Sequence, residues 1–193
     1  SIPGTKLTAE GPLLVTHWGL SGPAVLRISA WGARDLHALE YKFPLEINFS
    51  GEKNLAAVEL LLADIKSENG KKTVFANPAL SLPARLWQRL VEAAGILPER
   101  RWADMGKSEM QQLSLQTGRA TFQVSGKSTF KEEFVTAGGV ALKELNFKTF
   151  ESRICPNLFL AGEVLDIDAI TGGFNFQAAW TGGWLAGNAM ALQ

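Results

Sequence analysis

The residues whose types and spacing could do chemistry lie in the C-terminal part of the chain. In sequence order they are the apolar run 158–160, then Gly162, Glu163 and Asp166, then Gly172 and Gly173. A short apolar run predicts a strand buried on both faces, and open α/β sheets bind ligands where such strands end. Adjacent glycines leave the peptide N–H groups uncovered. The pattern therefore predicts a strand, a turn and a helix whose positive end faces a dinucleotide.

These residues also have simpler interpretations. Gly172 and Gly173 taken alone are equally typical of an ordinary loop before a helix, and Glu163 could be a charge on a surface loop. The combination of an acidic residue after a strand with a glycine pair before a helix favours the ligand site.

Composition narrows the class of protein. The chain has 193 residues, which suits one sizeable domain or two small ones. Hydrophobic residues make up 46% and charged residues 20%, with 19 basic and 19 acidic side chains. Because no global field arises from this balance, we expect neither nucleic acid nor an acidic membrane surface as a partner. No apolar stretch approaches the roughly 18 residues needed to span a bilayer, so no membrane segment is expected.

The numbers of cysteines and histidines limit which disulfides and metal sites the chain could form. Cys155 is the only cysteine, which excludes an intramolecular disulfide and a cysteine zinc cluster and favours a cytoplasmic location. The 2 histidines and the scattered carboxylates show no spacing typical of metal ligands. We expect no metal site.

Hydrophobic periodicity and turn residues predict the elements that position these groups. Helices are expected at 22–34, 53–69, 81–95 and 107–117, and strands at 43–49, 121–125 and 130–136. A boundary near residues 136–139 is expected to divide a mixed unit, residues 1–136, from a C-terminal segment, residues 137–193. The first unit has β-rich parts at 1–50 and 119–136 and a helical part at about 53–118.

A dinucleotide-binding sheet normally begins with a Gly-x-Gly-x-x-Gly turn, and this sequence contains none. Three stretches, 16–26, 135–142 and 158–180, nevertheless carry a resemblance to a known family. The chain resembles the bacterial aminoacetone-oxidase-like or BaiN/RdsA-like NAD(P)/FAD-dependent oxidoreductases, within the two-dinucleotide-binding-domain flavoproteins. It matches only the later part of a family member.

The resemblance implies the architecture. In this family an insert splits the FAD domain, and the chain returns to that domain around a Thr-x-Gly-Gly segment, here Thr136, Gly138 and Gly139. The expected fold class is α+β: a barrel-like mixed β and helical insert domain, then the strand-turn-helix of a Rossmann-like FAD-binding domain. The N-terminal half of that domain is absent, so the chain would be a fragment whose natural partner is the missing half.

The resemblance also implies roles. The first free N–H groups of the last helix, those of Phe174, Asn175 and Phe176, would face the N1 and C2 carbonyl edge of the flavin, where reduction places negative charge. Glu163, or less favourably Asp166, would accept hydrogen bonds from the ribityl hydroxyls. Gly162 would lie beside them.

Other candidates keep two interpretations. Thr136, Gly138 and Gly139 either line the flavin pocket or form a hinge between the two units. His17 either faces the substrate side of the flavin as a proton donor or has a structural role. Trp180 and Trp184 are expected in the core or in contacts between domains rather than stacked on the flavin.

Two functions follow from these observations. The first is the C-terminal portion of an FAD-dependent oxidoreductase that takes hydride from NAD(P)H or from a reduced substrate; the isolated chain would be inactive and would retain no FAD. The alternative is a non-catalytic lid or interaction module that self-associates, as a homodimer or by segment swapping, through its orphan C-terminal segment.

Overall fold

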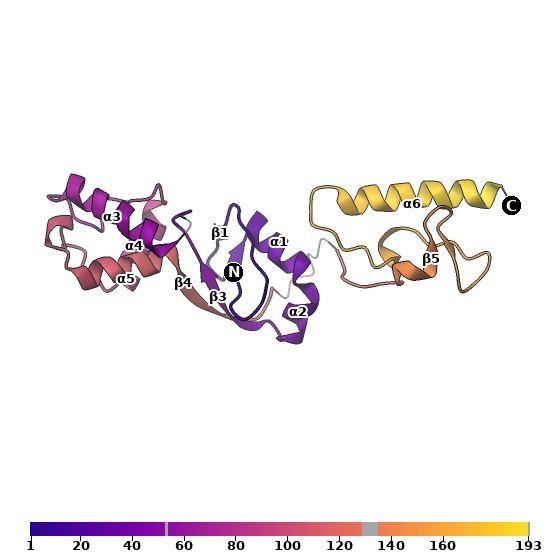
Figure 1. The fold of residues 1–193 in the computed structure, drawn as a ribbon, viewed down its shortest axis with the longest axis horizontal. Coiled ribbons are helices and arrows are strands. Elements are labelled where there is room, and N and C mark those ends of the chain that lie inside the picture. The colour runs from indigo at the N-terminus through magenta and orange to yellow at the C-terminus, as the bar shows by residue number, and fades with distance from the viewer. Residues whose placement is uncertain (53, 129–134, 193) are drawn as a thin grey trace. The chain divides into compact units, whose positions relative to one another are not determined.

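A computed structural model describes residues 1–52, 54–128 and 135–192, which Figure 1 shows as a ribbon. Its helices are α1 (Pro23–Trp31), α2 (Ala33–Ala38), α3 (Leu55–Asn69), α4 (Ala84–Ala93), α5 (Lys107–Gly118) and α6 (Phe174–Ala191). Three 3₁₀ turns are η1 (Trp102–Asp104), η2 (Leu142–Glu144) and η3 (Gly162–Val164). The strands are β1 (Leu14–Val15), β2 (Leu20–Ser21), β3 (Lys42–Ile47), β4 (Ala120–Ser125), β5 (Leu145–Asn146) and β6 (Glu151–Ser152).

The chain divides into two compact units. The first comprises residues 1–4 and 43–124, and the second comprises residues 5–42 and 125–193. The predicted division into residues 1–136 and 137–193 stays a prediction.

The helical part of the first unit is built around a closed apolar core, to which α3, α4 and α5 contribute (Figure 1). Val58 and Leu62 are four residues apart on α3 and are fully buried, as their helical spacing predicts. Trp87 of α4 stacks on Trp102 with ring centroids 6.1 Å apart, and its Nε1–H donates to the Val74 carbonyl at 2.7 Å. This hydrogen bond lets a large amphipathic ring occupy the core.

The predicted helices of this part are confirmed within a few residues. The side chain of Asn54 caps α3 by accepting the Ala57 N–H at 2.9 Å, which satisfies one free donor of the first turn. At the C-terminal end of α4, Gly95 has φ of +74°, the left-handed conformation in which glycine ends helices.

The strands pair in three two-stranded sheets, β1–β2, β3–β4 and β5–β6. Strands β1 and β2 are antiparallel, with Leu14 opposite Ser21. The expected mixture of α and β elements is confirmed, but within residues 1–52, 54–128 and 135–192 no sheet closes into a barrel. Most of the strand predicted at 130–136 lies outside the described residues.

The single helix predicted at 22–34 is wrong, because the structure divides it at Gly32 into α1 and α2. A Cβ at Gly32 would lie 2.5 Å from Leu7 Cδ1 and 2.9 Å from the Ile28 carbonyl oxygen, so glycine allows this close packing. Ser21 is in β2, and Gly22 is the N-cap of α1, without a side-chain hydrogen bond.

The C-terminal part of the second unit has its own small core, with Leu145, Phe150, Leu165 and Ala186 buried. Phe150 packs on Gly182 of α6, where an added Cβ would lie 2.6 Å from the ring. Figure 1 shows α6 running beside β5. The helix predicted after the Gly-Gly turn is therefore confirmed, and one of its glycines is used for close packing.

The buried strand predicted at 158–160 is wrong. Phe159 forms only an isolated antiparallel bridge with Glu151, flanked by hydrogen bonds of 2.7 Å from Ser152 N–H to the Leu158 carbonyl and 3.0 Å from Leu160 N–H to the Phe150 carbonyl. Leu158 is 42% exposed. A strand buried on both faces needs a neighbouring strand on each side and layers above and below, and the described residues supply only one edge.

Trp180 and Trp184 are 70% and 68% exposed, so their predicted place in the core is wrong for the described chain. Their role in contacts between domains stays a prediction. Even α6, with its 18 residues, is not apolar enough to cross a membrane, and neither is any other described helix.

Candidate flavin site

The turn before α6 has the conformation that its two glycines suggest. Gly172 and Gly173 have φ of +119° and +93°, a region that residues with a side chain rarely adopt. A Cβ at Gly173 would meet no atom within 4 Å, so space is open beside this backbone. The turn is both conformationally restricted to glycine and accessible to a ligand.

The first backbone N–H groups of α6 are available to donate hydrogen bonds to a ligand. The first intrahelical bond of this end runs from the Gln177 N–H to the Gly173 carbonyl at 2.8 Å. Within the described chain the N–H groups of Phe174, Asn175 and Phe176 donate to no acceptor. Together with the helix dipole they form a positive, hydrogen-bonding surface suited to an anionic or carbonyl oxygen.

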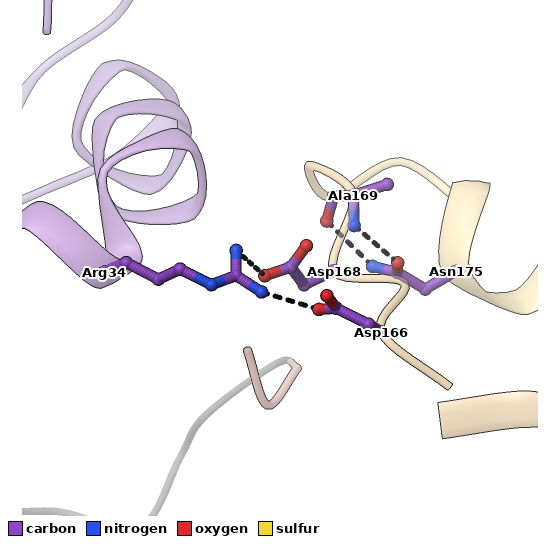
Figure 2. Close-up of polar contacts among 5 residues, drawn as sticks. All are labelled: Arg34, Asp166, Asp168, Ala169 and Asn175. Carbon is purple, nitrogen blue, oxygen red and sulfur yellow. Dashed lines mark hydrogen bonds and ion pairs between the residues drawn. The ribbon is translucent and has the colours of Figure 1, made fainter. Parts of the chain in front are cut away.

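The side chain of Asn175 has a different role from its backbone. Its Oδ1 accepts the Ala169 N–H at 2.9 Å and its Nδ2 donates to the Ala169 carbonyl at 2.9 Å (Figure 2). This pair of hydrogen bonds closes the loop that contains the glycine turn. Asn175 therefore contributes a backbone donor to the candidate site and uses its amide to shape the loop.

Glu163 lies in η3, which packs against α6. A Cβ at Gly162 would be 3.9 Å from Ala179 Cβ, which places this turn against the second turn of the helix. One oxygen of Glu163, Oε1, accepts the Thr136 N–H at 2.9 Å. Its Oε2 has no protein donor in the described residues, so the exposed carboxylate retains acceptor capacity.

The segment 136–140 lies along η3 and the residues after it. Val140 forms a parallel bridge with Leu165, with hydrogen bonds of 2.9 Å from Val140 N–H to the Val164 carbonyl and 3.0 Å from Asp166 N–H to the Val140 carbonyl. Gly139 has φ of +139°, and an added Cβ would lie 2.6 Å from backbone atoms of Val164 and Leu165. Only glycine permits this approach.

The structure thus brings together most of the residues predicted from the sequence. Thr136 contacts Glu163 through its backbone N–H, Gly139 lies against the backbone of Val164 and Leu165, and Val140 pairs with the segment that contains Asp166. Gly138, with φ of +104°, has open space where a Cβ would be.

Asp166 has a partner that sequence reasoning missed. Arg34 of α2 bonds Asp166 Oδ1 at 2.6 Å through Nη2 and lies 3.7 Å from Asp168 Oδ2 through Nη1 (Figure 2). Arg34 precedes Asp166 by 132 residues, and no local pattern links positions so distant. The alternation of Asp166 and Asp168 was the only available signal, since residues two apart in an extended loop share a side.

His17 is not part of this group. It lies in the turn between β1 and β2, is exposed, and contacts Trp18 with ring centroids 4.2 Å apart and ring planes tilted by 33°. Among the described residues, no backbone hydrogen bond joins it to the glycine turn or to Glu163. Its catalytic role stays a prediction.

Two shallow cavities of about 340 and 460 Å³ lie on the helical part of the first unit, the larger beside Lys71, Lys72 and Arg101. In the candidate site, Glu163, Gly173 and Phe174 are exposed. The residues that the structure describes include no group of three or more His, Cys, Asp or Glu positioned to hold a metal ion.

Comparison with known proteins covers almost the whole chain. Residues 3–135 match the family described as HI0933-like protein barrel and H2TH domain. The ribosomal RNA dihydrouridine synthase of Escherichia coli K12 is 33% identical over 173 residues, 89% of this chain and 40% of the relative. The protein of the same name from Haemophilus influenzae is 31% identical over 182 residues, 94% of this chain and 42% of the relative.

A third relative is the 3-dehydro-bile acid delta(4,6)-reductase of Clostridium scindens, 28% identical over 190 residues, 97% of this chain and 46% of the relative. The chain therefore spans less than half the length of the curated relatives it matches.

Proposed function

Since the chain belongs to the HI0933-like family, whose barrel and H2TH domain its residues 3–135 match, we propose that it is part of a flavin-dependent oxidoreductase. It contributes the ribityl and isoalloxazine side of the FAD site and one wall of the substrate cavity. The observation that carries this proposal is the meeting of segments 136–140 and 162–166 beside α6, whose N-terminal turn is open at Gly173.

The residues present fit a flavin. Three backbone donors, those of Phe174, Asn175 and Phe176, form a preorganised positive surface for the N1 and C2 carbonyl edge. Charge stabilisation by fixed dipoles is usually the largest single contribution that proteins make to such chemistry. Glu163, whose second oxygen is free of protein donors among the described residues, would accept hydrogen bonds from the ribityl hydroxyls. Glu163 suits this role better than Asp166, because Arg34 already engages the Asp166 carboxylate at 2.6 Å.

When bound, FAD supplies two-electron hydride transfer. The chain's own residues would hold the flavin: the N-terminal end of α6 would stabilise negative charge on it, the loop closed by Asn175 fixes that helix end, and η3 positions Glu163. Nicotinamide, NADH or NADPH, is the proposed electron donor.

The relatives suggest a substrate class. Forming dihydrouridine saturates a ring C=C bond conjugated to a carbonyl, and a delta(4,6)-reductase of a 3-dehydro bile acid acts on double bonds conjugated to a 3-oxo group. We propose the shared chemistry, hydride addition to a C=C bond conjugated to a carbonyl. The expectation that no nucleic acid binds stays a prediction. Activity would be assayed on the chain complemented with its missing half-domain, with uridine-containing RNA and with a conjugated enone as alternative substrates.

The FAD site needs residues beyond those described. The sequence contains no Gly-x-Gly-x-x-Gly turn, which in dinucleotide-binding sheets holds the pyrophosphate. We therefore propose as partner a half-domain carrying that turn, and we expect the chain by itself to retain no FAD and to be inactive.

The test is flavin retention. The purified chain is incubated with excess FAD, desalted, and its visible flavin absorbance recorded, alone and with the half-domain from a relative supplied in trans. We expect a flavin spectrum only with the added half. A spectrum from the chain alone contradicts the split site, and no spectrum from two folded, associated pieces contradicts the flavin proposal.

One observation favours the second candidate, a non-catalytic module that self-associates. Phe176, Trp180 and Trp184 follow one another at intervals of four on α6 and are 67%, 70% and 68% exposed. Such a stripe is typical of a surface covered by another protein segment. Light scattering distinguishes the candidates, because a monomer at high concentration contradicts self-association.

A further inference from the structure

Arg34 forms ion pairs with the loop of residues 166–169, which leads to the glycine turn at residues 172–173. Its two terminal nitrogens lie 2.6 Å from Asp166 Oδ1 and 3.7 Å from Asp168 Oδ2 (Figure 2). The planar guanidinium presents several donors in a fixed arrangement and can engage two carboxylates at once. A lysine ammonium in its place is a single point charge.

The loop has two further contacts. At its end nearer the glycine turn, Asn175 holds the backbone of Ala169 through two hydrogen bonds of 2.9 Å. At the end that Arg34 contacts, the Asp166 N–H donates to the Val140 carbonyl at 3.0 Å. The glycine turn at 172–173 lies between Ala169 and Asn175, so the position of the α6 N-terminus depends on the contacts that fix Ala169 and the residues before it.

The positive charge of Arg34 also compensates part of the negative charge of Asp166 and Asp168. Asp166 and Asp168 are both partly buried, with side chains 35% and 23% exposed, and Arg34 is the cation paired with them among the described residues. Two uncompensated carboxylates near an acceptor of electrons would disfavour the negative charge that reduction creates. The guanidinium offsets one of the two charges.

We propose that Arg34 is a positioning residue of the flavin site: it joins α2 to the 166–169 loop, orders the approach to the Gly172–Gly173 turn, and balances the carboxylates beside it. This inference rests on the proposed flavin function for its last step, but the ordering of the loop by Arg34 does not depend on it.

The first experiment measures that ordering without flavin. Hydrogen–deuterium exchange is followed in peptides covering residues 161–176 for the wild-type chain, Arg34→Gln and Arg34→Lys. We expect Arg34→Gln to speed exchange in this segment roughly two- to fivefold, the range typical of a largely exposed ion pair. Arg34→Lys should retain part of the protection that Arg34→Gln loses, because lysine keeps the positive charge but cannot engage both carboxylates as the planar guanidinium does.

The matched control is Arg27→Gln. Arg27 is a neighbouring arginine on α1 that donates to the Glu10 carbonyl at 3.1 Å and lies over the Trp31 ring, and in the described residues it pairs with no carboxylate. We expect its exchange in 161–176 to match the wild type. If Arg34→Gln unfolds the chain, Asp166→Asn combined with Asp168→Asn tests the same contact from the loop side.

The second experiment uses the chain complemented with the half-domain that carries the pyrophosphate turn. Arg34→Gln is expected to weaken FAD binding severalfold and to make the flavin reduction potential more negative, whereas Arg27→Gln changes neither. A purely structural loss of loop order would weaken binding without shifting the potential in this direction.

The outcomes are distinguishable. Equal exchange in Arg34→Gln and the wild type overturns the inference whatever the flavin result. Faster exchange in Arg34→Gln combined with an unchanged reduction potential overturns the charge-balancing role. A wild-type complex that takes up no FAD overturns the proposed function and the flavin role of Arg34 with it, even where exchange shows that Arg34 orders the loop.

Discussion

The helical core of the first unit and the C-terminal segment of the second use their large side chains in opposite ways. Trp87 and Trp102 are completely buried and stack on each other, whereas Trp180 and Trp184 of α6 are 70% and 68% exposed. The same residue type closes a core in one region and covers a surface in the other. The helical core buries its large apolar side chains within itself. By contrast, α6 leaves large aromatic side chains exposed, where another segment or protein could contact them.

Glycine shows the same contrast at the level of single residues. Gly182 is packed under Phe150, while the adjacent Gly183 has no neighbouring atom within 4 Å of the place where a Cβ would be. One face of α6 therefore packs against other residues, and another face has no packing partner at Gly183. The candidate flavin site lies at the N-terminal end of this helix.

The strongest test of the comparison replaces tryptophans. Trp87→Ala should lower the free energy of unfolding by about 3–5 kcal/mol, because it leaves a large cavity beside Trp102 and removes the partner of the Val74 carbonyl. Trp180→Ala should change it by less than about 0.5 kcal/mol. Denaturant unfolding monitored by circular dichroism measures both; similar losses would erase the distinction between the two regions.

Flavin binding tests the open end of α6. In the complemented protein, Gly173→Val should abolish flavin retention, because φ of +93° is closed to a β-branched residue. Glu163→Ala should weaken FAD binding roughly ten- to a hundredfold, the effect of losing hydrogen bonds to a charged group. Equilibrium titration of flavin fluorescence measures the Kd.

The control for Glu163 is Glu144→Ala, which removes a carboxylate from η2, outside the candidate site. Its Kd should equal that of the wild type. Unchanged FAD content in both Gly173→Val and Glu163→Ala would show that the site is assigned to the wrong residues.

Adjacent glycines of α6 allow a sharper comparison. Gly182→Ala should destabilise the second unit by about 1–3 kcal/mol, since its Cβ would lie 2.6 Å from the buried Phe150 ring. Gly183→Ala should stabilise it by up to about 1 kcal/mol through higher helix propensity. Thermal unfolding of the two variants gives opposite shifts; shifts of the same sign would mean that the two faces of α6 do not differ as described.

Self-association is the smallest expected effect. If the exposed stripe on α6 mediates dimers, Trp184→Ser should weaken association by about 1–2 kcal/mol, as expected for an aromatic residue central to an interface. Trp31→Ser, at a tryptophan that is 61% exposed on α1, is the control and should leave association unchanged. Sedimentation equilibrium measures both, and a monomeric wild-type chain would remove this role from the stripe.

Several features of the site could be predicted from the sequence because they depend on local backbone chemistry. The helix beginning at Phe174 and the positive φ of Gly172 and Gly173 follow from a glycine pair preceding an apolar run. The expectation that Thr136, Gly138 and Gly139 either line the flavin pocket or form a hinge came from the resemblance to a family rather than from any local pattern, and it stays a prediction. The contact of this segment with Glu163 in the structure depends on backbone pairing between Val140 and Leu165.

Other features could not be predicted. The ion pair of Arg34 with Asp166 joins positions 132 residues apart, and the strand expected at 158–160 is reduced to a single bridge because a strand exists only where neighbouring backbones pair with it. Both depend on which segments meet, which hydrophobic periodicity does not encode.

The sequence by itself determined the local elements: the helices of the first unit, the α6 helix and the glycine turn before it, since periodicity, caps and glycine conformations act within a few residues. Only the tertiary structure decided that Gly139 lies against the backbone of Val164 and Leu165, that Arg34 holds the Asp166–Asp168 loop, and that Trp87 is buried while Trp180 is exposed. Burial and ion pairing depend on contacts between distant segments, and the same residue type can occupy a core or a surface according to what packs against it.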